Sequence, residues 1–236
     1  DRLGVSPDKI FVMPLGVEDE FCPGAVSEDR KQALRRKFRL SGRFIINTSP
    51  FEARKNIAGL IAGFASVPRD LRGDVQLVIA GKMSEHDRGE IAAIAAAEGL
   101  AKTDVVLPGF VSDEDLIDLY RFCEIMVFPP FSEGFGLPPL EAMACGAAVL
   151  ASSATSVPEV MGRDDVLFDP TDPGDIARAI ARVLRDPALR EELRAYGPLR
   201  AATFSWDQSA KAILQVFEGA ATRSESAVSA PPSRPP

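Results

Sequence analysis

The stretch IMVFPPFSEGFGLPPLEAMACGAAVLA, residues 125–151, contains two short apolar runs separated by a glycine turn and a helical pattern. The runs 125–129 and 147–151 are continuously apolar rather than alternating, which is typical of strands buried on both faces of a parallel sheet. Pro138 suits the first turn of a helix, and Gly146 suits its end. The order strand, turn, helix, strand therefore predicts a βαβ unit, the building block of a parallel α/β fold.

The same alternation extends along most of the chain. Further apolar runs, each read as a strand, lie at 44–47, 75–80, 105–108 and 166–168, and the run 11–13 is a further strand or a lead-in. Helical patterns lie at 57–64, 92–97, 112–120, 138–145, 176–184 and after 205. This repetition predicts an α/β fold with a doubly wound, Rossmann-like parallel sheet and helices on both faces.

The chain divides by composition into one domain and two flanking segments. We expect residues 10–220 to form the folded domain, and residues 1–9 to be a linker or the end of a preceding domain. Residues 221–236 are rich in Ser, Pro and Ala, which predicts a disordered tail. The first residue is not Met, which indicates a piece of a longer protein.

Composition argues against several classes of function. With 27 Lys and Arg against 34 Asp and Glu, the net charge of −7 argues against a nucleic-acid binder, which needs a basic face. A single His excludes a His-rich metal site and argues against a Ser–His–Asp triad. The three Cys have no CxxC spacing, so we expect buried, reduced thiols in a cytoplasmic protein. No apolar run is long enough to span a membrane.

The glycine turn after the run 125–129 is the richest candidate site. Gly134 and Gly136 let the backbone approach a ligand closely, and the helix that follows directs free amides and its positive dipole end at the turn. Glu133 and Glu141 bracket the turn and can face one crevice. The alternatives are a plain glycine turn and, for Glu141, a carboxylate that only stabilises the helix dipole.

A second candidate site follows the run 44–47. Arg54 and Lys55 lie where the next helix begins, although cations favour the opposite end of a helix. A bound polyanion explains this placement, and a solvated pair of charges is the alternative. The turns after 75–80 and 105–108 offer Lys82 and Phe110, which we interpret mainly as ordinary turn residues.

Several motifs occur in an order that resembles a known family. They are GVEDEF (16–21), EARKN (52–56), LVIAG (77–81), VVLPGFVSDEDLIDLY (105–120), FPPFSEGFGLPPLEAMACGAAVLASSATSVPEV (128–160) and FSW (204–206). This pattern resembles the C-terminal, donor-binding domain of the retaining family 4 glycosyltransferases. Enzymes of that family have the GT-B fold, in which two Rossmann-like domains face each other. The resemblance implies that the chain is one half of such an enzyme.

The resemblance also implies roles for individual residues. Glu133 is expected to contact the transferred sugar and support the reaction centre, and Lys55, with Arg54 beside it, to neutralise the diphosphate. Glu141 is expected to bind the ribose hydroxyls. The loop whose amides meet the sugar and the distal phosphate matches Gly134, Phe135, Gly136 and Leu137, and the segment that reads the base matches Phe110 and Val111. Ser49 is also expected to belong to the donor-binding site, where it departs from the pattern because many members have an Arg six residues before the lysine.

The reaction implied is transfer of a hexose from a nucleotide-diphosphate sugar to an acceptor hydroxyl with retention of configuration, as a hexosyltransferase. We expect no metal and no cofactor. The run SVPEVMGRDDVLFDP, residues 156–170, looks most like enzymes that use GDP-mannose in surface polysaccharide synthesis, with UDP-hexoses next. The alternatives are a non-hydrolysing UDP-sugar 2-epimerase and a donor-binding module that is inactive on its own.

The expected partners are a nucleotide-sugar donor, an acceptor glycan or lipid-linked glycan, and an N-terminal domain of the same polypeptide. In the family that domain supplies the acceptor pocket, so we expect the isolated chain not to catalyse transfer. No nucleic acid is expected as a partner. The expected location is the cytoplasm at the inner face of the membrane, with peripheral membrane association through the N-terminal domain.

Overall fold

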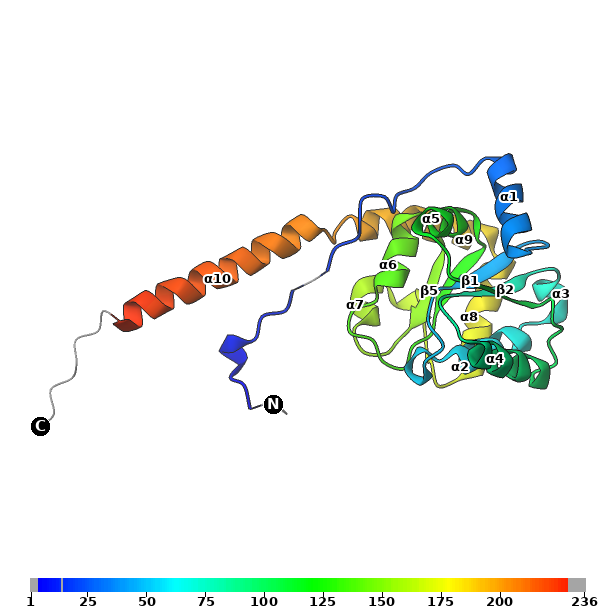
Figure 1. Cartoon of the computed structure of the whole chain (residues 1–236), viewed down its shortest axis with the longest axis horizontal. Helices are drawn as coiled ribbons and strands as arrows, with labels where there is room; N and C mark the ends of the chain where they lie inside the picture. The colour runs from blue at the N-terminus through cyan, green and yellow to red at the C-terminus, as the bar shows by residue number, and fades with distance from the viewer. Residues whose placement is uncertain (1–3, 14, 229–236) are drawn as a thin grey trace, which may run out of the picture. The chain divides into compact units, whose positions relative to one another are not determined.

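The computed structural model of the chain describes residues 4–13 and 15–228. The described chain forms two units: residues 19–203 make one, and the described residues of the two end segments, 4–13, 15–18 and 204–228, make the other. The larger unit contains the whole sheet and is shown in Figure 1 with its helices labelled.

The sheet has six strands, and every pair of neighbours is parallel. The strands are β1 (Phe44–Asn47), β2 (Gln76–Ala80), β3 (Val105–Gly109), β4 (Ile125–Phe128), β5 (Val149–Ser152) and β6 (Leu167–Phe168). Their order is β3-β2-β1-β4-β5-β6, the order of the doubly wound dinucleotide-binding fold. The α/β class and the parallel sheet expected from the sequence are therefore confirmed.

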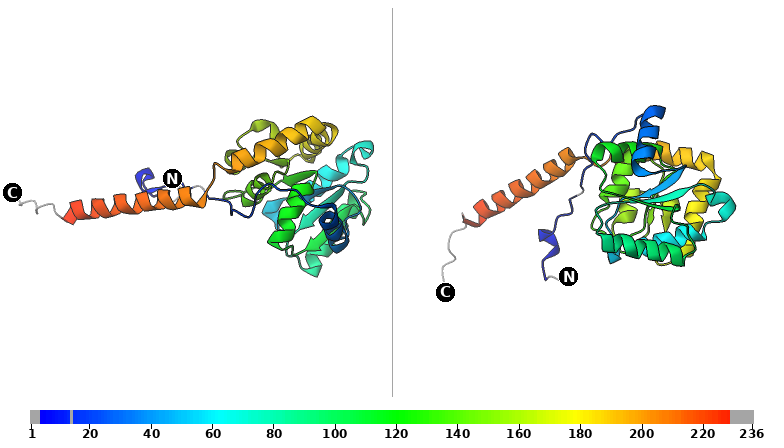
Figure 2. Two further views of the ribbon diagram at one scale, coloured as in Figure 1. Left: turned by 90° about the horizontal axis from the view of Figure 1, so that it is seen from above. Right: turned by 45° about the vertical axis from the view of Figure 1, so that its right-hand side comes forward.

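Helices cover both faces of the sheet. They are α1 (Glu28–Phe38), α2 (Ile57–Ser66), α3 (Arg69–Arg72), α4 (Glu85–Ala97), α5 (Asp113–Phe122), α6 (Leu137–Ala144), α7 (Val157–Met161), α8 (Pro173–Arg185) and α9 (Pro187–Ala201). One layer contains α2, α4 and α8, and the other contains α5, α6 and α9 (Figure 1). Figure 2 shows the enclosed sheet from two further directions.

The apolar stripe that predicts α2 is its buried face. Ile57, Leu60, Ile61 and Phe64 are each at most 2% exposed. Gly63 lies on the same helix where α8 approaches: a Cβ there would lie 2.7 Å from Cγ2 of Ile176, so a larger residue would push the two helices apart. Burial of one apolar stripe and a close approach to α8 therefore hold α2 in its layer.

Some elements differ from the sequence expectation. Residues 11–13 are not a strand; they lie outside any regular element, with exposed side chains. The sequence patterns do not predict the helices α1 and α9. Only Leu34 and Phe38 of α1 are buried, so its apolar signal is weak. Helix α9 contains Gly197 and Pro198, which sequence reasoning treats as breaks.

The end segments form the second unit. Its long helix α10 (Trp206–Val228) continues past residue 220, where composition predicts a disordered tail, and residues 229–236 of that tail lie outside the described residues. Of the expected linker 1–9, residues 1–3 are also outside them, and Pro7–Lys9 form a short 3-10 turn, η1. In this unit Gly16 lies against the backbone of Trp206. Along the described part of the chain, no helix combines the length and apolar character needed to cross a bilayer.

Candidate active site at the switch point of the sheet

The strand order reverses between β1 and β4, which are neighbours in the sheet although two strands separate them in sequence. In doubly wound sheets the carboxyl ends of the strands at such a reversal form the ligand-binding crevice. The two loops that leave this point are 48–56 after β1 and 129–136 after β4. The fold therefore brings together the two loops that the sequence marks as candidate sites, one with Arg54 and Lys55 and the other with Glu133 and the glycine turn.

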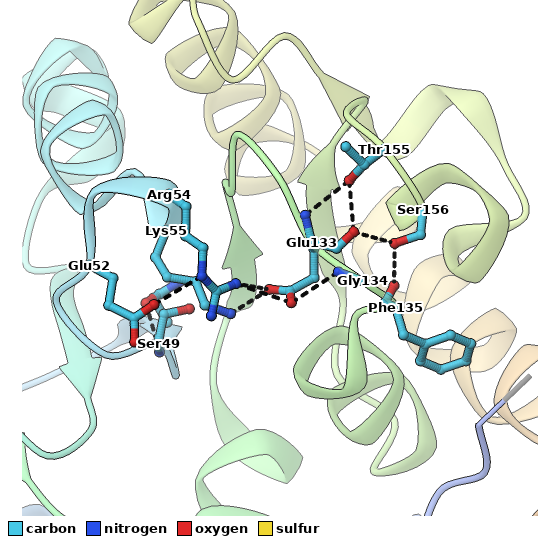
Figure 3. A network of polar contacts seen from close by, with 10 residues as sticks. Ser49, Glu52, Arg54, Lys55, Glu133, Gly134, Phe135, Thr155 and Ser156 are labelled. Carbon is cyan, nitrogen blue, oxygen red and sulfur yellow. Dashed lines mark hydrogen bonds and ion pairs between the residues drawn. The ribbon is translucent and has the colours of Figure 1, made fainter. Parts of the chain in front are cut away.

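The centre of the site is an ion pair between these loops. The Nζ of Lys55, at the end of the 3-10 turn η2 (Ala53–Lys55), donates a hydrogen bond to Oε2 of Glu133 (Figure 3). Lys55 is only 7% exposed and lies over the ring of Phe128, with Nζ 5.4 Å from the ring centroid. Burial by itself would raise the pKa of Glu133, but the hydrogen bond and charge of Lys55 outweigh it and hold that pKa below its ordinary value. Glu133 is therefore an ionised acceptor, and Lys55 is not a solvated surface charge.

Arg54 extends this pair toward solvent. Its Nη1 lies 3.3 Å from each carboxylate oxygen of Glu133, and its Nε lies 3.0 Å from Oε2 of Glu52. The carbonyl of Arg54 also accepts the N–H of Phe131 at 2.8 Å, which joins the two loops through their backbones. Arg54 is half-exposed, so its guanidinium can turn to a ligand at a small entropic cost.

Asn56 holds the first loop in place, and sequence reasoning did not single it out. It adopts a left-handed conformation, with φ of 55°, and its Oδ1 accepts the N–H of Gly59 to cap α2. Its Nδ2 donates to the carbonyls of Pro129 at 3.1 Å and Pro170 at 2.7 Å. One buried side chain thus ties the loops after β1, β4 and β6 together and fixes the backbone next to Lys55.

The glycine turn leads directly into α6. Gly136 has φ of 114°, a conformation that L residues rarely adopt, and occupies the N-cap of α6. Because glycine has no side chain, the first amides of the helix have no side-chain cap. At Gly134 a Cβ would have no atom within 4 Å, so the backbone there is open to a ligand. Both features suit an anion or a sugar hydroxyl.

Glu141 lies inside α6 and differs electrostatically from Glu133. Its side chain is half-buried and has no ion-pair or hydrogen-bond partner among the described residues. Burial raises the pKa of Glu141 to about 7, and the negative charge of Asp113 adds to the shift. The structure therefore contains one carboxylate neutralised by a lysine and a second that lacks a counter-charge.

The other candidate residues have different environments. Ser49 is 1% exposed, and its buried Oγ has no hydrogen-bond partner within the described chain, while its N–H donates to Oδ1 of Asn47 at 3.1 Å. Phe110 and Val111 follow β3, two strands away from β1 in the sheet. Phe110 is 69% exposed beneath Lys82, whereas Val111 is buried.

The two larger hollows of the domain lie away from this site. Two hollows of about 590 and 680 Å³ lie elsewhere in the domain, one along β3 and one beside α8, and Lys55, Glu133 and Glu141 line neither. Within residues 4–13 and 15–228, no three His, Cys, Asp or Glu side chains cluster so that they could hold a metal ion. The three Cys are free; contrary to the expectation of buried thiols, Cys22 is exposed.

Comparison with known proteins agrees with this architecture. The family model described as "Glycosyl transferases group 1" matches residues 30–200. The chain is 38% identical over 213 residues to the serotype-specific mannosyltransferase WbdA of Escherichia coli, covering 90% of this chain and 26% of that protein. It is 31% identical over 211 residues to the O-antigen chain mannosyltransferase B of Escherichia coli, covering 89% and 55%. The chain thus spans about a quarter to a half of these relatives.

Solved structures show the same fold. The C-terminal domain of the glycosyl transferase group 1 family protein LpcC from Francisella tularensis is 28% identical, with a TM-score of 0.66; the match covers 80% of this chain and 97% of that one. WaaG, a glycosyltransferase involved in lipopolysaccharide biosynthesis, has a TM-score of 0.74 at 18% identity, covering 88% and 56%.

The doubly wound sheet with its site at the strand reversal is a Rossmann-like domain of the GT-B type. The chain belongs to the glycosyl transferases group 1 family. This confirms the family that the sequence motifs indicate.

Proposed function

We propose that this chain is the donor-binding domain of a retaining hexosyltransferase that uses a nucleotide-diphosphate sugar. The observation that carries the proposal is the ion pair between Lys55 and Glu133 at the strand reversal. Glu133 lies three residues before Gly136, the N-cap of α6. A cation, a set of helix amides without a side-chain cap and a carboxylate then lie together at the carboxyl ends of β1 and β4. This combination matches a ligand that has a diphosphate at one end and a sugar at the other.

Each group has a chemical task in this proposal. Lys55, Arg54 and the first amides of α6 stabilise the diphosphate as it leaves with growing negative charge. Glu133 stays ionised because of Lys55, so it acts as a hydrogen-bond acceptor and stabilises an oxocarbenium-like sugar rather than donating a proton. Glu141 accepts hydrogen bonds from the ribose, and Phe110 and Val111 contact the base.

The remaining chemistry follows from the same groups. Lys55 and the helix dipole supply the positive charge that a metal provides in other transferases, so the proposed reaction uses no metal and no cofactor. No side chain is placed as a nucleophile in the proposal. The acceptor hydroxyl therefore attacks the anomeric carbon from the face that the diphosphate leaves. As the bond from the anomeric carbon to the phosphate oxygen breaks, that oxygen takes the hydroxyl proton, and the sugar keeps its configuration.

The donor we propose is GDP-mannose. Its support is that two matched relatives from Escherichia coli are named mannosyltransferases, one of them acting on O-antigen chains. The acceptor is then a hydroxyl of a surface polysaccharide or lipid-linked glycan, reached at the cytoplasmic face of the membrane. A second, N-terminal domain of the same polypeptide supplies the acceptor pocket, so the chain alone binds donor without transferring the sugar.

Calorimetric titration of the chain with GDP-mannose, UDP-glucose and dTDP-glucose tests the proposal. We expect GDP-mannose to bind most tightly and Lys55→Ala to lower its affinity at least tenfold. Lys102→Ala is the matched control, since Lys102 is an exposed lysine with no ion pair in the described structure. Tighter binding of UDP-glucose would show that the donor is a UDP-sugar and not GDP-mannose. Binding of none of the three would overturn the proposed function.

A further inference from the structure

The turn that follows β5 contacts the backbone of Glu133 with two hydroxyl groups. The Oγ1 of Thr155 accepts the N–H of Glu133 at 3.0 Å and lies 3.1 Å from the carbonyl oxygen of the same residue, to which it can donate. The Oγ of Ser156 lies 2.9 Å from that carbonyl and 3.1 Å from the carbonyl of Phe135 (Figure 3). The main chain of Glu133 is therefore held on both its N–H and its C=O side.

The backbone of Thr155 indicates that this contact is not incidental. Its φ is 52°, in the left-handed region, where a β-branched residue is strained and glycine is favoured. Its side chain is exposed, so burial in the core does not explain a threonine here. The two interactions of its hydroxyl with Glu133 are the feature of this position that glycine could not provide.

Ser156 points to the same conclusion by a separate observation. It is the N-cap residue of α7, a position where serine is favoured because its hydroxyl caps the helix. In this helix its side chain makes no cap hydrogen bond. The hydroxyl is directed instead to the carbonyls of Glu133 and Phe135 in the loop after β4.

We infer that Thr155 and Ser156 are positioning residues, which hold the Glu133 backbone in place so that its carboxylate stays at the sugar during transfer. The inference rests on the proposed function. In the structure the Glu133 side chain is held by Lys55, but a bound diphosphate competes for the same ammonium. The hydrogen bonds that the structure shows for the hydroxyls of Thr155 and Ser156 go to the main chain, so they still fix the loop when Lys55 has turned to the diphosphate.

Three substitutions at Thr155 separate positioning from folding. Thr155→Gly relieves the backbone strain but removes the hydroxyl, so the chain should be as stable as wild type while kcat falls at least tenfold. Thr155→Val removes the hydroxyl and keeps the strain, so both stability and kcat should fall. Thr155→Ser restores the hydroxyl and should restore kcat. Ser153→Ala is the control, because Ser153 is exposed in the same turn and its hydroxyl has no partner in the described chain.

Turnover is measured in the active transferase that contains this chain, and binding of GDP by calorimetry. GDP lacks the transferred hexose, so its Kd should stay within about twofold of wild type in all the Thr155 variants. Amide hydrogen exchange gives a readout independent of activity. The N–H of Glu133 should exchange at least tenfold faster in Thr155→Gly and at the wild-type rate in Thr155→Ser.

Glu133→Gln distinguishes failure of this inference from failure of the proposed function. If Glu133→Gln loses turnover while Thr155→Gly and Ser156→Ala keep wild-type kcat, the positioning role is wrong and the function stands. If Glu133→Gln turns over like wild type, the proposed role of Glu133 is wrong and the inference falls with it.

Discussion

The ammonium of Lys55 and the carboxylate of Glu133 form an ion pair although 78 residues separate them in the sequence. Each follows a different strand, and the strands β1 and β4 are neighbours only because the order of the sheet reverses there. The pair is largely shielded, since the two side chains are 8% and 15% exposed. A charge in this position is therefore weakly screened, which suits it to stabilise the charge of a leaving group.

Lys55→Ala should reduce turnover at least 100-fold, because loss of one preorganised charge contact at a reacting group costs about 3 kcal/mol of barrier. Lys55→Arg should also be impaired, since the larger guanidinium does not fit a slot that leaves Lys55 7% exposed above Phe128. Steady-state kinetics in the active transferase measure both. Wild-type turnover of Lys55→Ala would remove the role that we assign to this lysine.

Glu141→Gln should stabilise the chain at pH 8 and have little effect at pH 4.5. The pKa of Glu141 is raised from 4.5 to about 7 in the folded state, so the folded chain holds this proton more tightly than the unfolded chain. The resulting cost to stability grows as the pH rises from about 4.5 to 7 and then stays constant. By the linkage relation it reaches at most about 3 kcal/mol.

Urea unfolding of wild type and Glu141→Gln at pH 4.5 and pH 8 measures this difference. Glu98→Gln serves as the control, because Glu98 is exposed at the C-terminal end of α4. Equal stability of Glu141→Gln and wild type at pH 8 would show that the carboxylate has a counter-charge in solution.

Asn56→Ala should lower the free energy of unfolding by about 3 kcal/mol. It removes a helix cap, leaves the carbonyls of Pro129 and Pro170 without their donor, and places alanine at a φ of 55°. Asn56→Gly loses the same hydrogen bonds, but glycine is not strained at a φ of 55°. It should therefore be about 1 kcal/mol more stable than Asn56→Ala. The ranking is checked by urea denaturation; equal loss in both variants would mean that backbone strain contributes nothing.

Ser49→Ala should leave the chain as stable as wild type or up to about 1 kcal/mol more stable, because its buried hydroxyl has no partner in the described structure. The same change should weaken GDP-mannose binding about fivefold, the value of one hydrogen bond, if the hydroxyl meets the diphosphate. Denaturation and calorimetry measure the two effects. Loss of stability with unchanged affinity would assign the hydroxyl to the fold rather than to the donor.

Local sequence was sufficient for the elements with strong periodicity. The strand expected at 44–47 and the apolar face of α2 occur where the sequence predicts them. The sequence does not predict the helices α1 and α9. A helix needs only a narrow buried stripe, and it tolerates proline or glycine where tertiary packing compensates. Gly197 illustrates this. A Cβ there would lie 2.8 Å from the carbonyl oxygen of Met143, so the glycine is present because α9 passes close to α6, and it does not end the helix.

The same distinction applies to the candidate site. Glu133 and Lys55 could be named from the sequence, because glycines, charges and strand ends are local features of each loop. Asn56, Thr155 and Ser156 could not, because their roles depend on hydrogen bonds to residues 21 to 114 positions away.

By itself, the sequence determined the α/β class and the loops that contain the charged residues, because apolar periodicity and local turn chemistry belong to short segments. Its motifs also resemble those of the family. The tertiary structure decided that Lys55 neutralises Glu133, that Glu141 has no counter-charge among the described residues, and that two hydroxyls hold the Glu133 backbone. Ion pairing and burial depend on distances across the sheet, and these distances exist only once the strands have taken their order.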